Sequence, residues 1–273
     1  MSAASRIPIH YINLATRQDR RSFMDEQFSR LGLAAQRIEA VAPEQVPARL
    51  VRKFIVPSRY RWLTLGELAC SVSHLNAMET FLPGKAAHGL ILEDDAVLSG
   101  YLSRFLAEFA SAPPPYDVVR LETYDDWLRI HPRADHTVGE VELRQVYASP
   151  SGTAGYIISR LGAEKVLLNH DVFSAQIDMT LFHPFSQLAK RMSVRHADPG
   201  LCIQIHKLHR EHALGFPDIE PYRRRRAEME APYWRLHFDT FDWFDKYFHV
   251  GVMNRWHELV DGAGRRSIPF KPE

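Results

Sequence analysis

The sequence has few cysteines and little net charge. Only Cys70 and Cys202 are present among 273 residues, and both sit in apolar contexts, 68–70 and 201–203. They form no C-x-x-C motif, so the pattern favours two small buried side chains and allows a reducing compartment. The formal net charge is +1, which gives no overall signature of nucleic-acid binding. We expect any charged partner to bind at a local patch.

Long apolar runs and common catalytic motifs are also missing. No stretch reaches the run of about 18 apolar residues that a transmembrane helix needs. The first residues lack the apolar core of a secretory signal. The motifs G-x-S-x-G, H-E-x-x-H, G-x-x-x-x-G-K-[ST] and G-x-G-x-x-G do not occur. We therefore expect a cytoplasmic protein, either soluble or attached peripherally to the inner face of the cytoplasmic membrane.

Apolar runs and helical patterns alternate over most of the chain. Strands are expected at 7–14, 37–41, 89–93, 117–121, 152–159 and 201–205. Helices are expected from Asp19 to Gly32, from a capping box at Thr64 to Pro83, through Phe105 and Phe109, and over 161–168. Residues 42–60 and 123–146 are predicted to be mostly irregular. The alternation predicts an α/β domain over 1–210, with a mainly parallel, mixed sheet flanked by helices.

The composition changes after about residue 210. A basic run lies at 222–226, and nine aromatic residues lie between Tyr233 and Trp256. One interpretation is a helical C-terminal extension, 211–273, that packs over the edge of the domain. The other is a basic and aromatic surface that binds an anionic membrane.

An acidic triplet, 93–95, directly follows the apolar run 90–92. In open α/β sheets, ligands bind at the carboxyl ends of strands. Three adjacent carboxylates there repel one another unless a cation balances them, and their oxygens suit Mg²⁺ or Mn²⁺ with substrate phosphates. The alternative is an acidic helix N-terminus favoured by the helix dipole.

The end of the first predicted strand carries a second group of polar residues. Arg17 and Arg20, at the start of a helix, could hold an anionic nucleotide. Asp19 could cap that helix or bind a ribose or base. The alternative is an ordinary helix start with solvated arginines.

Three further segments have both a structural and a functional interpretation. In 66–74, Glu67 completes the capping box and His74 could be a core histidine or a site residue. The small residues of 152–156 allow a backbone to approach a ligand, or simply a tight strand entry. Asp178 could cap a helix or act in catalysis. His206, His209 and His212 are spaced so that at most one can be a metal ligand.

Taken together and in this order, these segments resemble glycosyltransferase family 25, which includes lipopolysaccharide and lipooligosaccharide β-galactosyltransferases and related collagen galactosyltransferases. The resemblance spans about 7–205. The residues that carry it are 11–14 with Arg17, Asp19, Arg20 and Arg21, then 63–74, 90–95, 152–159 and Asp178.

The resemblance implies a GT-A-like fold, a UDP-sugar donor, most often UDP-galactose, and Mn²⁺ or Mg²⁺. The implied acceptor is a glycan or glycolipid such as lipopolysaccharide, with no role for nucleic acid. The implied metal ligands are Glu93 and Asp95, completed by His206. The implied donor-binding residues are Asn13, Arg17, Asp19, Arg20, Ser73, His74, Asp94, Gly155 and Tyr156.

An inverting transfer needs a base for the acceptor hydroxyl on the face opposite the leaving UDP. We expect Asp178 to be this base, with Glu67 as the second choice. Two other functions stay open. A metal-dependent phosphoester or diphosphate hydrolase would turn over without a sugar acceptor, and a non-catalytic glycan- or membrane-binding protein would fold without transferring sugar.

Overall fold

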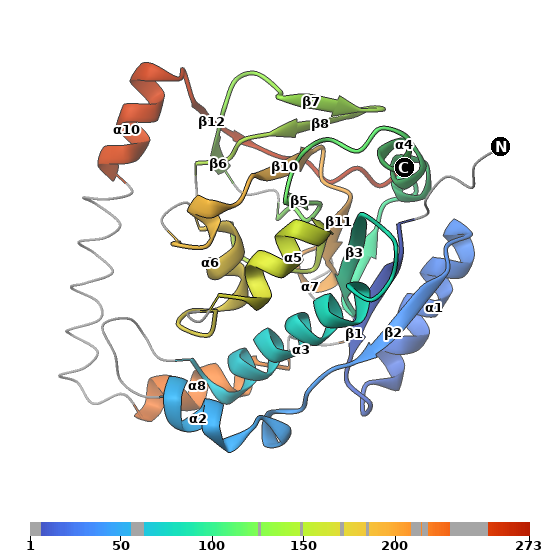
Figure 1. Ribbon diagram of the computed structural model, residues 1–273, viewed down its shortest axis with the longest axis vertical. Helices are drawn as coiled ribbons and strands as arrows, with labels where there is room; N and C mark the ends of the chain where they lie inside the picture. The colour runs from blue at the N-terminus through green and yellow to red at the C-terminus, as the bar shows by residue number, and fades with distance from the viewer. Residues whose placement is uncertain are drawn as a thin grey trace.

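The computed structural model describes residues 7–55, 63–124, 127–147, 150–169, 172–183, 186–208, 214, 218–229 and 251–273. Within these ranges, an eight-stranded sheet in the order β2-β1-β3-β9-β5-β10-β8-β7 runs through the molecule (Figure 1). Its strands are β1 Ile9–Asn13, β2 Ala35–Glu39, β3 His88–Glu93, β5 Val118–Arg120, β7 His136–Val138, β8 Val141–Arg144, β9 Gly155–Ser159 and β10 Val194–Asp198. The predicted α/β class is confirmed.

The sheet is mixed, and parallel pairing is less dominant than the sequence suggested. Strands β2, β1 and β3 are parallel to one another, and β5 is parallel to β10. Strand β9 runs antiparallel between β3 and β5, and β10, β8 and β7 form an antiparallel edge. Because β1 and β3 are parallel and in register at Ile12 and Glu93, the polar residues that follow them emerge at the same edge of the sheet.

Helices cover both faces of this sheet. Helices α1 (Gln18–Leu31) and α4 (Leu102–Ser111) pack on one face, and α3 (Leu65–Phe81), α5 (Arg160–Leu167) and α6 (Ile177–Phe182) pack on the other. Leu90 and Leu92 enter the first core, whereas Ile91 enters the second. Burial on both sides explains why the run 90–92 shows no polar alternation. Truncating one of these buried side chains to alanine should cost about 2–5 kcal/mol.

The capping box predicted before α3 is present. The Thr64 hydroxyl accepts a hydrogen bond from the Glu67 backbone N–H at 3.1 Å, and the Glu67 carboxylate accepts one from the Thr64 backbone N–H at 2.9 Å. These two bonds satisfy backbone donors that a helix N-terminus leaves unpaired. They fix the start of the helix that carries Glu67, Ser73 and His74.

Two regions contain more regular structure than the sequence predicted. Residues 42–60 hold a 3-10 turn, Pro43–Gln45, and helix α2, Ala48–Phe54. Residues 123–146 hold β6 (Trp127–Ile130) and the β7–β8 hairpin, whose turn uses Gly139 at φ +57°. These strands have three or four residues each, too few for a period-2 pattern to stand out. The strand expected at 201–205 is β11 (Cys202–Gln204), which pairs with β4 (Ala96–Leu98) in a separate small sheet.

The described parts of the C-terminal extension contact the rest of the domain. They comprise helix α8, Glu220–Met229, helix α10, Gly251–Val260, and strand β12, Gly264–Ser267. Strand β12 pairs antiparallel with β6, and Ile219 and Tyr222 lie directly over Gly66 at the start of α3. The aromatic residues that the sequence contains at 233–248 lie outside the described residues. Where the structure describes the chain, no helix is long and apolar enough to cross a bilayer.

Candidate active site

A cavity of about 760 Å³ opens where β1 and β3 end. This volume lies within the usual range of small-molecule sites. Its walls come from the turn after β3, from α3, from 151–153, from α6, from the start of α7 (Ile205–Leu208) and from 218–223. Nine of the predicted site residues line it, namely Arg20, Glu67, Ser73, His74, Glu93, Asp94, Asp95, Asp178 and His206. Asn13, Arg17, Asp19, Gly155 and Tyr156 are not among its lining residues.

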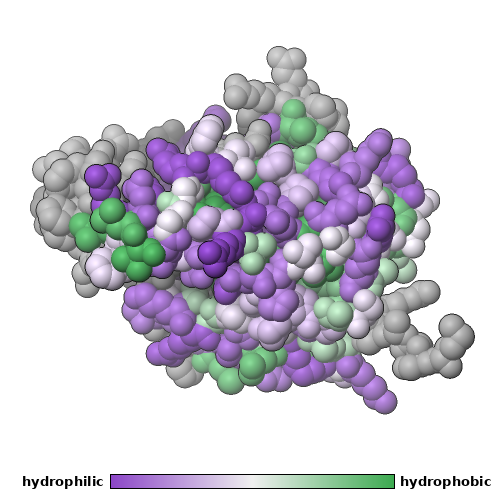
Figure 2. Space-filling view, turned by 90° about the horizontal axis from the view of Figure 1, so that it is seen from above, coloured by the Kyte–Doolittle hydropathy of each residue, from purple (hydrophilic) through white to green (hydrophobic). Residues whose placement is uncertain are grey.

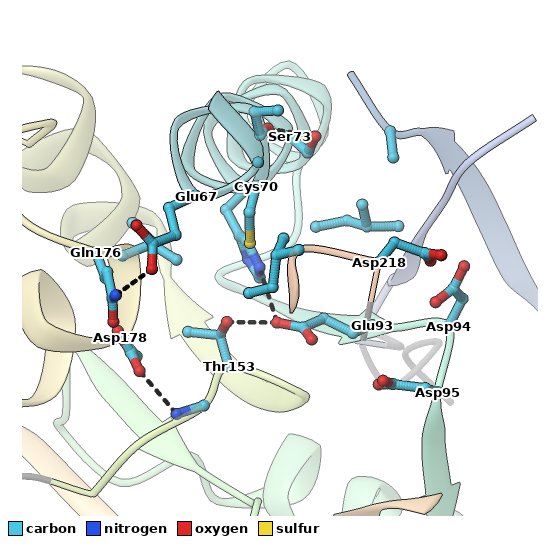
Figure 3. A pocket seen from close by; sticks show the side chains of 18 of the residues that line it. Glu67, Cys70, Ser73, Glu93, Asp94, Asp95, Thr153, Gln176, Asp178 and Asp218 are labelled. Carbon is cyan, nitrogen blue, oxygen red and sulfur yellow. Dashed lines mark hydrogen bonds and ion pairs between the residues drawn. The ribbon is translucent and has the colours of Figure 1, made fainter. Parts of the chain in front are cut away.

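Glu93 lies in the middle of the cavity between α3 and the segment before β9 (Figure 3). Its Oε1 is 3.3 Å from His74 Nε2 and accepts a hydrogen bond from the Thr153 hydroxyl. Its Oε2 accepts a long hydrogen bond, 3.3 Å, from the Gln204 amide. Burial alone would raise the pKa of Glu93, but the hydrogen bonds from His74 and Thr153 outweigh it, and the pKa is lowered. Glu93 is therefore a carboxylate at neutral pH.

Asp94 turns away from its neighbours and holds basic and amide side chains. It accepts a hydrogen bond from Arg20 at 2.9 Å and one from the Asn13 amide at 2.8 Å. Asn13 in turn accepts from Arg37 at 2.8 Å. Both Asp94 oxygens are therefore occupied. Asp94 positions Arg20 directly, and Asn13 positions Arg37, at the carboxyl ends of the strands.

Asp95 has a buried carboxyl group whose Oδ1 meets no hydrogen-bond partner among the described residues. Burial, followed by the negative charge of Glu93, raises its pKa to about 8. His206 lies beside it, because the Ile205 backbone N–H donates to the Asp95 carbonyl at 2.9 Å. Within the described part of the chain, His206 Nδ1 is likewise buried without a partner. An oxygen and a nitrogen ligand left unsatisfied at one cavity fit a divalent cation such as Mn²⁺.

The two predicted nucleotide-binding arginines are held by carboxylates. Arg17 donates to both oxygens of Asp218, at 2.7 and 2.8 Å, and to Asp19. The hydrogen bonds from Arg17 lower the pKa of Asp19 to about 2. Arg20 is buried, 2.9 Å from Asp94 and 3.4 Å from Asp218. Asp218 was not predicted, because its position 200 residues downstream in an aperiodic segment gives no sequence signal.

Asp178 lies on the side of the cavity opposite Asp94 and Asp95, with Glu93 and Thr153 between them (Figure 3). It is in the first turn of α6 and is nearly buried. Its Oδ2 accepts from the Gly152 backbone N–H at 2.9 Å, and its Oδ1 accepts from the Met179 N–H at 2.7 Å. These bonds fix the direction of the carboxylate at the cavity wall.

Glu67 lines the same wall, but basic side chains occupy its carboxylate. Oε1 accepts from Arg223 at 2.8 Å and from the Gln176 amide, and Oε2 accepts from Arg226 at 3.0 Å. Two arginines of the basic run thus point inward from α8. Both oxygens of the Glu67 carboxylate are therefore occupied by hydrogen bonds from neighbouring side chains.

Three further predicted residues make contacts that hold the elements around the cavity together, namely Gly155, Tyr156 and Ser73. A Cβ on Gly155 would lie 2.4 Å from the Cys202 sulfur, so close packing of β9 on β11 requires glycine here. The Tyr156 hydroxyl is 2.9 Å from His74 Nδ1. The Ser73 hydroxyl accepts from the Val41 backbone N–H at 2.9 Å, which ties α3 to the chain after β2.

These features define a class of protein, an α/β enzyme with a carboxylate-lined ligand cavity at the ends of parallel strands. The sequence profile of glycosyltransferase family 25, described as an LPS biosynthesis protein, matches residues 6–181. The match covers well over half of the chain, and the protein belongs to this family. The resemblance found in the sequence is confirmed, and the chain is a glycosyltransferase.

Several characterised bacterial proteins are similar over most of their length. The lipooligosaccharide biosynthesis protein lic2B of Haemophilus influenzae is 25% identical over 81% of this chain and 85% of its own. The lacto-N-neotetraose biosynthesis glycosyltransferase LgtE of Neisseria meningitidis is 28% identical over 96% and 99%, and LgtB of the same species is 32% identical over 71% and 74%. Among solved structures, a glycosyltransferase involved in the glycosylation of the major capsid of PBCV-1 matches 84% of this chain and 98% of its own, with a TM-score of 0.42 and 11% identity.

Proposed function

We propose that this glycosyltransferase moves a hexose, galactose in the first place, from a UDP-sugar to a lipooligosaccharide or lipopolysaccharide acceptor. We further propose that transfer inverts the sugar carbon and requires Mn²⁺ or Mg²⁺. The single observation that carries the proposal is the pair of unsatisfied ligand atoms on Asp95 and His206 at the cavity. The names of the similar proteins lic2B, LgtE and LgtB support the acceptor class.

Asp95 and His206 would hold the cation, and Glu93 would turn toward them to complete the set, because the ligand atoms of these three residues do not form a group within 4.8 Å among the described residues. The hydrogen bond from Gln204 to Glu93 is long, 3.3 Å, and a cation can replace it. When bound, the ion supplies positive charge that neutralises the diphosphate of the leaving UDP. Arg20 lies at the same wall, fixed by Asp94, and its guanidinium adds charge there without reorganisation.

Asp178 then acts as the general base from the opposite wall. The acceptor hydroxyl oxygen attacks the anomeric carbon, the bond from that carbon to UDP breaks, and the hydroxyl proton passes to the Asp178 carboxylate. The backbone N–H groups of Gly152 and Met179 keep this carboxylate oriented. Glu67 has a positioning role in this scheme, because it anchors α8 through Arg223 and Arg226.

The assignment of Asp178 is tested by Asp178→Asn. The amide keeps the shape of the side chain but cannot take the proton, so we expect kcat to fall by about 10²–10⁴ while UDP affinity changes less than about twofold. Mass spectrometry of the glycosylated acceptor measures transfer, and calorimetry measures UDP binding. Loss of UDP binding would instead place Asp178 in the donor site. Release of sugar without an acceptor would favour the hydrolase alternative.

Helix α10 offers a surface for the membrane that carries such an acceptor. Its polar side faces the protein, where His257 stacks on Tyr147 with ring centroids 3.9 Å apart and Glu258 pairs with Arg129 at 3.3 Å. Its apolar side faces outward and appears as a green patch at the left of Figure 2. That side carries the exposed residues Val252, Met253, Trp256, Leu259 and Val260.

We propose that this side of α10 rests on an anionic membrane surface, which places the enzyme at the cytoplasmic face of that membrane. Exposed Arg255 on the same helix and Arg265 on β12 supply the positive charge that anionic lipid headgroups attract. Leu259→Ser should reduce sedimentation with phosphatidylglycerol vesicles. Leu168→Ser is the matched control, because Leu168 is 78% exposed against 77% for Leu259 but lies after α5. Equal losses in the two variants would contradict the proposal.

A further inference from the structure

A second group of metal-binding atoms lies in the cavity, separate from the unsatisfied atoms of Asp95 and His206. The Cys70 sulfur, a His74 ring nitrogen and a Glu93 carboxylate oxygen all lie within 4.8 Å of one another. Cys70 and His74 are one turn apart on α3, and Figure 3 shows the Cys70 sulfur pointing toward Glu93. We propose that Cys70, His74 and Glu93 form a thiolate-containing site for Zn²⁺.

The His74 ring is oriented as in a metal ligand. Its Nδ1 is engaged by the Tyr156 hydroxyl at 2.9 Å, which leaves Nε2 directed at Glu93. Zinc-binding histidines commonly have the second ring nitrogen fixed by such an outer hydrogen bond. The Thr153 hydroxyl orients the Glu93 carboxylate in the same way.

The separation of the ligand atoms also suits a tetrahedral ion. Zn–N and Zn–O bonds of about 2.0–2.1 Å place two tetrahedral ligands about 3.3 Å apart. His74 Nε2 and Glu93 Oε1 are 3.3 Å apart. The Cys70 thiol is within reach of both, and it gives its proton to the buffer as the sulfur–zinc bond forms. Three protein ligands leave the fourth position open to the cavity.

Cys70, His74 and Glu93 together favour Zn²⁺ over the Mn²⁺ or Mg²⁺ that we propose for the transfer reaction. Thiolate and imidazole favour zinc, whereas Mg²⁺ and Mn²⁺ prefer oxygen ligands and Mn²⁺ stands at the weak end of the divalent series. Glu93 belongs to both sites. If the proposed metal-dependent transfer is correct, Zn²⁺ at Cys70 draws Glu93 away from the Asp95 site and inhibits the enzyme.

Titration of the full chain with Co²⁺ tests the zinc site without any transfer assay. We expect one Co²⁺ per chain with a sulfur-to-cobalt charge-transfer band that Zn²⁺ abolishes by displacement. Cys70→Ser should remove the band. The chain has one other cysteine, Cys202, which is buried beside Gly155, so Cys202→Ser is the matched control and should retain it.

His74→Gln should weaken Co²⁺ binding at least about tenfold, because it removes a ligand, and circular dichroism verifies that each variant is folded. Absence of the band in the wild type, or its persistence in folded Cys70→Ser, would overturn the proposal. In the transfer assay, Zn²⁺ inhibition should weaken at least about tenfold in Cys70→Ser. Because the cobalt band is measured without substrate, a protein that binds Co²⁺ through sulfur but transfers no sugar refutes the proposed function and leaves the zinc site standing.

Discussion

At the scale of single residues, Asp95 combines burial with a carboxylate that has an unsatisfied oxygen in the described structure. Burial and the charge of Glu93 raise its pKa from the ordinary 3.8 to about 8. A carboxyl group whose pKa is higher in the folded state than in the unfolded state contributes to the stability of the protein. This contribution is complete at pH values below the pKa of the unfolded state. That contribution is lost as the pH rises through the folded pKa.

We therefore expect Asp95→Asn to gain stability relative to the wild type as the pH rises from 5 to about 8 in the presence of chelator. The amide does not ionise, so this burial cost is absent from the variant. Thermal denaturation across that pH range measures the difference in Tm. Mn²⁺ should then stabilise the wild type and not the variant. A Tm difference that is independent of pH would contradict the assignment.

The cavity residues that could be predicted from the sequence are mainly those that belong to a recognisable local pattern. The acidic triplet that contains Glu93 and Asp95 was predicted because it follows the apolar run 90–92, whereas the resemblance to the family implied His206 as a metal ligand. Asp218, Gln204 and Arg223 also reach the cavity, but only through contacts between distant segments. Arg17 was predicted from its charge at a helix start and from the resemblance to the family, and neither shows that Asp19 and Asp218 already hold it.

At the scale of secondary-structure elements, Asp218 connects the segment before α8 to the start of α1. It binds Arg17 at 2.7 Å and lies 3.4 Å from Arg20, the two arginines that the resemblance to the family implies for donor binding. The Asp218 carboxylate thus competes with a diphosphate for the same guanidinium groups.

We expect Asp218→Asn to tighten UDP binding several-fold by removing this competing charge. Glu220→Gln is the matched control, because Glu220 is 38% exposed against 40% for Asp218 and pairs with Arg224 instead. Calorimetry at two salt concentrations measures both variants. Weaker UDP binding in Asp218→Asn would show that the carboxylate positions the arginines rather than competing for them.

The close contact between β9 and β11 requires a glycine at position 155. A methyl group on Gly155 would meet the Cys202 sulfur at 2.4 Å. Gly155→Ala should therefore lower the free energy of unfolding by about 1–3 kcal/mol, as measured by urea denaturation. Cys202→Ala should restore part of this loss in the double variant. If it restores none, the strain lies elsewhere.

Elements with a strong local signal were predicted well, and short edge elements were not. The capping box at Thr64 and the two-sided apolar run 90–92 identified α3 and β3. Strands β7 and β8 have three and four residues and form through pairing at the sheet edge. Tertiary contacts decide such elements, and a local pattern carries little information about them.

At the scale of the whole molecule, the C-terminal extension contributes to the site. Its residues Asp218, Ile219, Pro221, Tyr222 and Arg223 line the cavity. Arg223 and Arg226 pair with Glu67. The basic run was predicted to cover the domain edge or to bind a membrane. These two arginines in fact face the cavity wall, while α10 presents an apolar surface outward. The basic run carries no local sign of this pairing, because Glu67 lies 156 residues before Arg223 and 159 residues before Arg226 in the sequence.

We propose that Glu93, Asp95 and His206 bind a cation that is needed for donor binding. The most direct test is calorimetric titration of the full chain with UDP-galactose, with Mn²⁺ and with chelator, beside UDP-glucose and UDP-N-acetylglucosamine. We expect binding that requires Mn²⁺, favours UDP-galactose and is lost in Asp95→Asn. Equal binding of the donor with Mn²⁺ and with chelator would contradict it.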